Sequence, residues 1–495
     1  MKNIVITDLR TREMRDARED LEQRGYSVLT VPEDIPLWNE EKLRAFAADC
    51  GELAGVIHPA PPLFQCALED ADEEAFARAR DDGPIAAWSV TKVFGDILRK
   101  QQGGSLIYFN STHAEKPVGK GFLFSAGCGA VQMLSREASQ DYGSAGVRCY
   151  FIQRGPGPDD PDAKSDVSSV YYGTDLRYPL RKLPERGSLN GLLAFLLTPE
   201  AAMLSGSDLR ADGGQVMYYG ERTDRTLGRA VLPRREWEPG TGAEKEERVA
   251  IVTGSGKGVG AGIVRVLTHA GIRCVINCNS NRTMAEKTLE TIRAAGGEAF
   301  IHQADVSDPE QCRGMVAAAI ARYGRLDILV NNAAMQYNRF VDQYDLPLIR
   351  HLWDVNVGGY WRMIKYALPE LRKSPAGRII NIGSVHGKRP TCFDAGYAMT
   401  KGGIRMLTRE AALEFHADGI PVNSLTLGGC WIEFKTGEPP FRNWRPPEVN
   451  NPNLRSGPWL VQPEEVGEAV LWLSREAPAA MTGDSIRIDC GQMLK

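Results

Sequence analysis

The chain has 495 residues, a net charge of -4 and a hydrophobic content of 43%. This length exceeds what one hydrophobic core normally fills, so we expect more than one domain. The near-balanced charge is not that of a strongly basic nucleic-acid-binding protein, and no uninterrupted apolar run approaches the length of a membrane span. We therefore expect neither nucleic acid nor a membrane as a partner.

The first residues, M-K-N-I-V-I-T-D-L-R, carry charges where a signal peptide would need an apolar stretch. The ten cysteines lack the paired short spacings of a zinc site, and the closest pair, Cys274 and Cys278, lies in a predicted strand and its exit. We expect reduced cysteines, no metal site and a cytoplasmic protein.

In both halves, short runs rich in β-branched residues alternate with longer amphipathic stretches. The first half has such runs at 3–7, 27–31, 54–58, 105–110 and 147–152. The second half has them at 248–253, 273–278, 327–331, 378–382 and 421–426. This alternation is typical of strand–helix–strand units in a parallel sheet. The predicted fold class is α/β, with two tandem Rossmann-like domains, each a doubly wound parallel sheet.

An internal repeat supports the two domains. Residues 124–138 and 397–411 share M-L-[ST]-R-E-A in register, and residues 204–217 resemble residues 481–494. The stretch 218–247 between them is polar and contains prolines and glycines, which is typical of a linker. The predicted domains are therefore 1–217 and 248–495, joined by a linker at 218–247.

A glycine-rich turn, T-G-S-G-K-G-V-G at 253–260, follows the first strand of the second half and precedes a helix pattern. Glycines there let the backbone approach a pyrophosphate, and the helix N-terminus offers N–H donors. Such a turn alone is equally typical of a plain tight connection. Two further features in the expected order, Asp305 after the third strand and the N-N-A-A turn at 331–334 after the fourth, favour a dinucleotide site.

Tyr397 and Lys401 are four residues apart, so a helix places both on one face. A tyrosine hydroxyl has an ordinary pKa near 10 and needs a nearby cation to act as an acid or base at neutral pH. Ser384 ends a strand and is expected to hold a substrate oxygen in line with Tyr397. Asn356 is expected to hold a water on the proton route of Lys401. We predict these four residues as the catalytic group.

With these motifs, residues 248–495 resemble the short-chain dehydrogenase/reductase family. The resemblance implies hydride transfer between a nicotinamide and a carbinol carbon, with Tyr397 as proton donor or acceptor and Lys401 as ribose ligand. It departs from the family where Leu427-Gly428 replaces the usual Pro-Gly. The expected cofactor-binding residues are Gly254, Ser255, Lys257, Gly258, Val259, Gly260, Asn279, Arg282, Asp305, Val306, Asn331, Ala333, Tyr397 and Lys401.

The residues after the second strand, 275–282, contain no acidic side chain to bond a ribose 2′-hydroxyl. Lys257 and Arg282 are cations in positions that suit a 2′-phosphate, although surface cations often have no ligand. We predict NADP as the cofactor, with NAD as the alternative.

The first half has lost this chemistry. Its glycine-loop frame, residues 7–14, contains no glycine, and the positions aligned with Asn356, Tyr397 and Lys401 are Gly83, Phe124 and Cys128. Ser111 and His113 remain. Cys128 is interpreted as a packing residue rather than a nucleophile. Because family members pair through the tyrosine helix and the last strand, the resemblance implies that the inert half is a built-in partner, and that two chains form a homodimer resembling the family's tetramer.

Residues 430–447 mix aromatic and basic side chains where the family has its substrate loop. Gln336, His386 and Trp431 are candidate substrate contacts. We expect a small-molecule substrate, a secondary alcohol or carbonyl on a sugar, polyol or hydroxy acid. The competing hypothesis is a regulator or scaffold that senses NADP without turnover, which the intact Ser384, Tyr397 and Lys401 disfavour.

Overall fold

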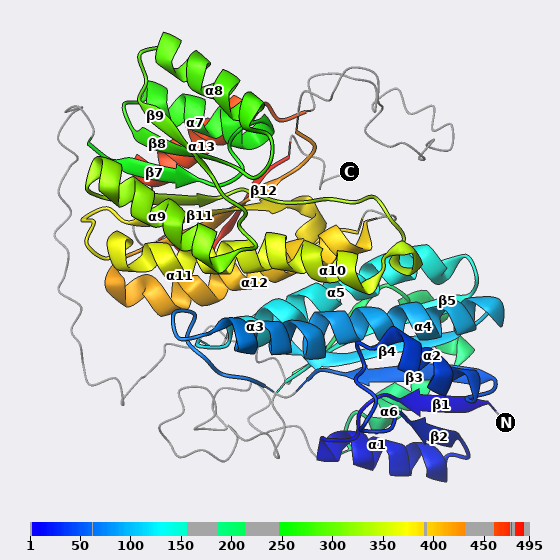
Figure 1. Ribbon diagram of the computed structural model, residues 1–495. Coiled ribbons are helices and arrows are strands. Elements are labelled where there is room, and N and C mark those ends of the chain that lie inside the picture. The colour runs from blue at the N-terminus through cyan, green and yellow to red at the C-terminus, as the bar shows by residue number, and fades with distance from the viewer. Residues whose placement is uncertain are drawn as a thin grey trace, which may run out of the picture. The chain divides into compact units, whose positions relative to one another are not determined.

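A computed structural model describes residues 2–61, 63–117, 119–155, 187–212, 247–390, 394–430, 460–475, 477 and 481–489. Within these ranges the chain forms two parallel sheets flanked by helices (Figure 1). The predicted class, tandem Rossmann-like α/β domains, is confirmed. Most of the predicted linker, and the predicted substrate loop from Trp431 onward, lie outside the described residues.

The second half forms a seven-stranded sheet in the order β13-β12-β11-β10-β7-β8-β9. Its strands are β7 (Val249–Val252), β8 (Arg273–Cys278), β9 (Ala299–Gln303), β10 (Ile328–Asn331), β11 (Arg378–Ser384), β12 (Val422–Leu427) and β13 (Ser485–Ile488). All neighbouring pairs are parallel. The strand order reverses between β7 and β10, and such a reversal forms a ligand-binding crevice at the carboxyl ends of the strands.

The first half forms a six-stranded parallel sheet in the order β2-β1-β3-β4-β5-β6. Its strands are β1 (Asn3–Ile6), β2 (Ser27–Thr30), β3 (Leu53–Pro59), β4 (Gly104–Ser111), β5 (Val147–Arg154) and β6 (Asp208–Ala211). Residues 31–52, all described, contain helix α2 (Glu40–Ala48) but no strand. The first half therefore has no counterpart of β9, the strand that precedes Asp305.

The helices of the second half cover both faces of its sheet (Figure 1). They are α7 (Gly258–His269), α8 (Arg282–Ala294), α9 (Pro309–Tyr323), α10 (Leu346–Trp353), α11 (Gly359–Leu371), α12 (Ala395–Phe415) and α13 (Pro463–Arg475). Helices α7 and α13 pack closely because Gly262 has no side chain. A Cβ there would lie 2.4 Å from Pro463. The apolar residues between this pair, α8 and the sheet form a continuous buried core.

The helices of the first half are α1 (Arg12–Gln23), α2, α3 (Glu73–Arg80), α4 (Ala86–Lys100), α5 (Phe122–Gly143) and α6 (Asn190–Leu196). A π-helical turn, Asp81–Ile85, joins α3 to α4, and a second one, Asp354–Gly358, joins α10 to α11. Gly83 and Asn356 are each the third residue of their turn. The repeat thus preserved an unusual backbone feature at the position where one half lost its asparagine.

The contacts divide the chain into two compact units that do not follow the two halves of the sequence. Unit 1 comprises Met1–Pro62, Asp82–Val118 and Ala138–Lys245. Unit 2 comprises Leu63–Asp81, Gly119–Glu137 and Glu246–Lys495. Two segments of the first half, which contain α3 and most of α5, therefore pack with the second half. The boundaries at 217 and 248 describe the sequence repeat and stay a prediction.

Inside unit 2, the segment with α3 packs on α11. The rings of Phe76 and Trp361 stack with centroids 4.9 Å apart, and the indole N–H of Trp361 donates to Leu68 O at 3.0 Å. Glu73 forms an ion pair with the buried Arg362 at 2.6 Å. These contacts combine apolar burial with satisfied polar groups, as in a protein core.

The segment with α5 packs on α12. A Cβ at Gly129 would lie 2.7 Å from Gly402 O, so the two helices approach closely only because both positions are glycine. Further along α12, the buried Glu410 carboxylate accepts hydrogen bonds from Ser125 Oγ at 2.5 Å and Gly119 N at 2.8 Å. Glu414 accepts from Leu68 N at 2.7 Å. Helix α12 is therefore covered by first-half residues.

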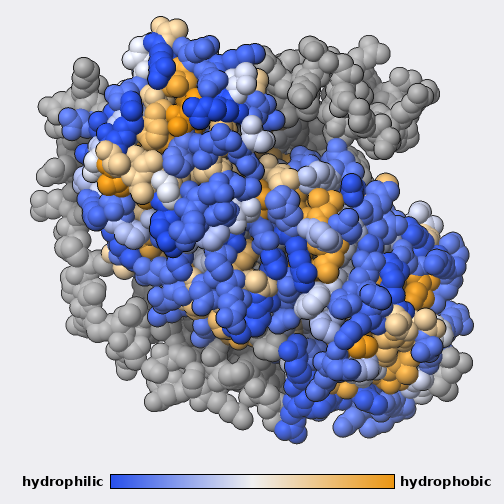
Figure 2. Space-filling view, viewed as in Figure 1, coloured by the Kyte–Doolittle hydropathy of each residue, from blue (hydrophilic) through white to orange (hydrophobic). Residues whose placement is uncertain are grey.

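The surface seen in Figure 2 is mainly hydrophilic, and its apolar residues lie in several small areas. Most large apolar side chains are inside the sheets and helix contacts, including Trp88 and Trp361. No helix among the described residues is long and apolar enough to cross a membrane.

Candidate active site

The glycine-rich turn lies between β7 and α7 and is shaped by close backbone contacts. Gly254 has a φ of +61°, and a Cβ there would lie 2.8 Å from Ala333 Cα. A Cβ at Gly260 would lie 2.7 Å from Gly254 O. Gly258, the first residue of α7, has a φ of +58°. Side chains at Gly254 and Gly260 would collide with the protein's own backbone, so the turn keeps this tight shape only with glycine. Glycines in such a turn are what lets a backbone approach a pyrophosphate.

The N-terminus of α7 has no side-chain cap among the described residues, since Lys257 at the cap position makes no such hydrogen bond. Its first backbone N–H groups point out of the helix end, where the helix dipole favours negative charge. A pyrophosphate fits this position. The exposed ammonium of Lys257 lies at the same end.

The loop is held from beneath by buried side chains. Asn277 of β8 accepts a hydrogen bond from Gly254 N at 2.9 Å, and Ser255 donates to Val252 O at 2.6 Å. Ser255 is fully buried, so its contribution is to the shape of the loop. Asn277 was not predicted, although it is the buried polar residue one position before the end of a strand at this crevice.

Asn279 donates to Asp305 Oδ2 at 2.9 Å, which joins the ends of β8 and β9. Ser307 also donates to Asp305, through Oδ1 at 2.7 Å. Val306 is buried, and a Cβ at Gly359 would lie 2.7 Å from its side chain. Arg282 is exposed and pairs with Glu286 at 3.0 Å. Arg282 therefore already has a carboxylate partner.

The N-N-A-A turn after β10 is anchored to the first strand. Asn331 is fully buried and donates to Asn381 Oδ1 at 3.0 Å, which links β10 to β11. Asn332 donates to Thr253 O at 2.8 Å, and Ala333 N donates to Thr253 Oγ1 at 3.0 Å. Val259, the second residue of α7, is partly buried and packs against the hydrophobic core. The turn closes the crevice, with Asn331 inside the sheet and Ala333 against the glycine loop.

Ser384, Tyr397 and Lys401 come together at the carboxyl end of β11. Ser384 is the last residue of that strand, and its hydroxyl partly offsets the increase that burial causes in the pKa of the Tyr397 phenol. Lys401 Nζ lies 5.3 Å from the centroid of the Tyr397 ring and donates to Ile382 O at 2.8 Å. The i and i+4 spacing on α12 thus places both groups over the end of the sheet.

Burial dominates the electrostatics of this group. It raises the pKa of Tyr397, and the Asp394 carboxylate adds to that increase. Burial lowers the pKa of Lys401 to about 7. Desolvation disfavours the charged form of each group. A phenolate at Tyr397 consequently requires a cation at close range.

Asn356 lies in the π-helical turn Asp354–Gly358 and is fully buried. Its side chain accepts from Met335 N at 2.7 Å and donates to Met335 O at 2.9 Å. It also donates to Thr400 Oγ1 at 2.9 Å, one residue before Lys401. Asn356 therefore ties the turn after β10 to the helix of the reactive pair.

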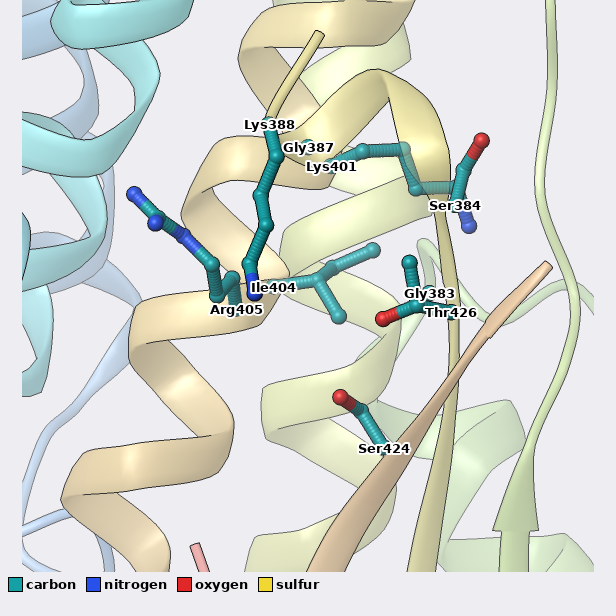
Figure 3. Close-up of a pocket in the computed structure, with 9 residues that line it drawn as sticks. All are labelled: Gly383, Ser384, Gly387, Lys388, Lys401, Ile404, Arg405, Ser424 and Thr426. Atoms are coloured by element: carbon teal, nitrogen blue, oxygen red, sulfur yellow. The ribbon is translucent and has the colours of Figure 1, made fainter. Parts of the chain in front are cut away.

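A cavity of about 10 Å³ lies between α12 and the strands β11 and β12, with Lys401 in its lining (Figure 3). It is lined by Gly383, Ser384, Gly387, Lys388, Lys401, Ile404, Arg405, Ser424 and Thr426. This volume is near the minimum for one water molecule. The cavity is too small for a substrate.

Two of the three predicted substrate contacts are described: His386 lies near Tyr397, and Gln336 contacts Asp394, three residues before that tyrosine. The His386 ring is 6.2 Å from the Tyr397 ring, and burial lowers the pKa of His386 to about 4. Gln336 is exposed and donates to Asp394 Oδ2 at 2.6 Å. The third contact, Trp431, lies outside the described residues. Asp394 was not predicted as a site residue. The sequence signals it only as an acidic residue three positions before Tyr397.

The corresponding positions of the first half are closed by its own side chains. In unit 1, Thr7 hydrogen bonds to His58 at 2.8 Å, and both are buried. Glu13 at the start of α1 pairs with Arg154 at 2.8 Å. Ser111 hydrogen bonds to His113, and burial lowers the pKa of that histidine to about 4.

In unit 2, Phe124 and Cys128 of α5 are both buried. The eight cysteines in the described part of the chain form no disulfide. The described part of the chain contains no group of three or more histidine, cysteine or acidic side chains that could hold a metal ion.

Comparisons with known proteins agree with this geometry. The sequence model of the family described as short chain dehydrogenase matches residues 248–438, and one described as Enoyl-(Acyl carrier protein) reductase matches residues 2–215. The fold and site thus define an oxidoreductase that uses NAD(P) to interconvert alcohols and carbonyls.

Similar proteins include Glucose 1-dehydrogenase 2 of Bacillus subtilis, 32% identical over 50% of this chain and 95% of its own length. The 3beta-hydroxysteroid dehydrogenase 1 of Eggerthella lenta is 33% identical over 50% of this chain and 94% of its own length. The D-beta-hydroxybutyrate dehydrogenase of Rhizobium meliloti is 30% identical over 49% of this chain and 98% of its own length. The chain belongs to the short-chain dehydrogenase/reductase family.

Proposed function

We propose that the second half oxidises or reduces a secondary alcohol or its carbonyl on a sugar, polyol or hydroxy acid, and that the first half has no catalytic role. The observation that carries this proposal is the convergence of Ser384, Tyr397 and Lys401 beside an open glycine loop and an uncapped helix. NAD(P), when bound, supplies the hydride acceptor or donor.

The protein's own groups handle the proton and the substrate oxygen. Ser384 holds the oxygen by a hydrogen bond, and Tyr397 takes the hydroxyl proton during oxidation or returns it during reduction. Lys401 supplies the positive charge that a buried phenolate needs. Asn356 is tied to this helix through Thr400, and we propose that it holds a water on the route by which Lys401 exchanges protons with solvent.

We propose NADP as the preferred cofactor. The support is the absence of an acidic residue among 275–282 and the exposed ammonium of Lys257 at the uncapped N-terminus of α7. Arg282 gives weaker support because it is paired with Glu286.

We also propose that the inert half is a built-in partner of the active half. The support is that α12, which carries Tyr397 and Lys401, is covered inside unit 2 by first-half residues through Gly129 and Glu410. A homodimer of chains and a cytoplasmic location stay predictions from the sequence. Light scattering after size-exclusion chromatography tests the homodimer, and a monomer would contradict it.

The central test is a panel of sugars, polyols and hydroxy acids, each followed by the absorbance of reduced cofactor with NAD and with NADP. We expect turnover of at least one compound, lost in Tyr397→Phe. Turnover confined to NAD would contradict the cofactor proposal. Absence of turnover with the whole panel, while cofactor still binds, would favour a sensor over an enzyme.

A further inference from the structure

The side chain of Gln336 is held in one orientation. Its Nε2 donates to Asp394 Oδ2 at 2.6 Å and lies 3.5 Å from Asn338 Oδ1. Both contacts use the amide N–H₂ group. The oxygen, Oε1, is then the atom that Gln336 offers to a ligand, and an amide oxygen can only accept hydrogen bonds.

Asp394 enforces this orientation whatever its charge. Its side chain is fully buried at the start of α12. A carboxylate accepts at both oxygens, so the ionised form requires an N–H from Gln336. In the neutral acid, the hydrogen is expected on Oδ1, which lies 3.3 Å from the hydroxyl of Tyr344, because that hydroxyl donates its one hydrogen to Tyr337 O at 2.5 Å. Oδ2 remains an acceptor for Gln336 in both states.

Burial and the charge of Glu137 raise the pKa of Asp394 to about 8, against the opposing effect of the hydrogen bond from Gln336. Burial thus favours the neutral form of this acid. A neutral Asp394 avoids placing a buried negative charge three residues from Tyr397, where it would oppose formation of the phenolate.

His386 presents a second acceptor. Its Nδ1 lies 3.4 Å from Arg389 O, and because a carbonyl only accepts, the hydrogen of the neutral imidazole is on Nδ1. The other nitrogen, Nε2, is then a hydrogen-bond acceptor. The ring packs edge-on to Tyr397.

We propose that Gln336 and His386, with Asp394 as the residue that orients Gln336, select an uncharged polyhydroxylated substrate, a sugar or polyol, over a hydroxy acid. Substrate hydroxyls donate to Gln336 Oε1 and His386 Nε2, whereas a substrate carboxylate has no hydrogen to donate to either atom. Placing two acceptors against an anion leaves polar atoms unpaired and disfavours its binding. This inference rests on the proposed oxidoreductase function and narrows its substrate.

The test uses pairs of compounds that differ only by a hydroxymethyl or a carboxylate group: D-glucose with D-glucuronate, and butane-1,3-diol with 3-hydroxybutyrate. We expect the parent protein at pH 7 to have a larger kcat/KM for the uncharged member of each pair that it turns over. A preference for the acid in either pair would overturn the inference and leave the proposed function intact. If neither pair nor any compound of the wider panel reacts, both fail together.

Two variants locate the selectivity. Gln336→Leu removes the acceptor, and Asp394→Asn lets the Gln336 amide rotate, because Asn can donate as well as accept. In each we expect the ratio of kcat/KM for uncharged over acidic substrate to fall about tenfold, the loss of roughly one hydrogen bond. An unchanged ratio in both would overturn the inference.

A binding measurement separates selectivity from folding. In Tyr397→Phe loaded with NADP, D-glucose and D-glucuronate are titrated by calorimetry, with and without Asp394→Asn. We expect the Kd for NADP to be the same in both proteins and only the preference between the sugars to change. Loss of NADP binding in Asp394→Asn would assign Asp394 a structural role instead.

Discussion

Helices α1 and α7 follow corresponding strands in the two halves, but their N-terminal ends are built differently. Helix α1 is capped by its own chain, since Thr11 accepts a hydrogen bond from Met14 N at 3.3 Å, and the ion pair of Glu13 and Arg154 lies beside it. Helix α7 begins at glycines and has no side-chain cap. A capped end is complete without a ligand, whereas an uncapped end has donors for an anion.

The comparison teaches that the first half differs from the second at several separate positions of the site rather than at one. The glycine loop became a capped turn, β9 has no counterpart, and Gly83 replaced the asparagine in a retained π-helical turn. Helix α5 nevertheless makes a close contact with α12 through Gly129 and Gly402.

The reactive tyrosine gives the sharpest difference between the halves. Tyr397→Phe should lower kcat/KM by about 10²–10⁴-fold, the usual range for a general acid or base, while NADP still binds. The reciprocal variant Phe124→Tyr should add no activity, because the first half lacks the glycine loop. Steady-state kinetics on both variants measure this, and activity restored by Phe124→Tyr in the Tyr397→Phe background would show that the first half still holds a site.

The close approach of α5 and α12 gives a stability test of the retained surface. Gly129→Ala should lower the free energy of unfolding by about 1–3 kcal/mol, because its Cβ would lie 2.7 Å from Gly402 O. Gly143→Ala is the matched control, since a Cβ at that end of α5 meets nothing within 4 Å. Equal urea unfolding midpoints for the two variants would contradict the close contact.

The same surface should respond to pH through Glu414. Burial and the charge of Glu410 raise its pKa from 4.5 to about 7, so the folded protein binds more protons than the unfolded chain between these values. The stabilisation is present below pH 4.5 and is lost as pH rises through 7. Relative to Glu414→Gln, the parent should lose about 1–3 kcal/mol between pH 5 and 8.

Urea unfolding at several pH values measures this slope. The exposed Glu468→Gln serves as the control and should keep the pH dependence of the parent. If Glu414→Gln also kept the pH dependence of the parent, a group other than Glu414 would be responsible for it.

The smallest effect concerns the cofactor phosphate. Lys257→Ala should raise the KM for NADP about fivefold, as expected for one exposed cation on a phosphate worth roughly 1 kcal/mol, with little change for NAD. Arg12, the cation at the start of the capped helix α1, should have no effect when replaced by alanine. Equal effects of Lys257→Ala on both cofactors would remove the support for NADP preference.

Much of the fold could be predicted because buried parallel strands are short β-branched runs, and those runs recur in both halves. The strands found at the predicted runs begin and end within two residues of them, as with Gly104–Ser111 for 105–110. The strands β6, β9 and β13 were not among those runs. The lost counterpart of β9 could not be predicted, because matching runs between the halves shows what is shared. The glycine loop and the reactive tyrosine were predictable because their chemistry is local in sequence.

Contacts between distant residues were beyond prediction. Asp394 is 58 residues from Gln336 and 50 from Tyr344, so its effect on the substrate site depends on the turn after β10. The membership of α3 in unit 2 likewise depends on contacts such as that of Glu73 with Arg362, 289 residues away. No spacing rule connects such pairs.

The number of cofactors bound per chain tests the central claim most directly. Calorimetric titration of the full chain with NADP, and separately with NAD, should give one site per chain, and Gly254→Asp in the second half should abolish it. Two sites per chain, or a site that survives Gly254→Asp, would contradict the conclusion that only the second half binds the dinucleotide.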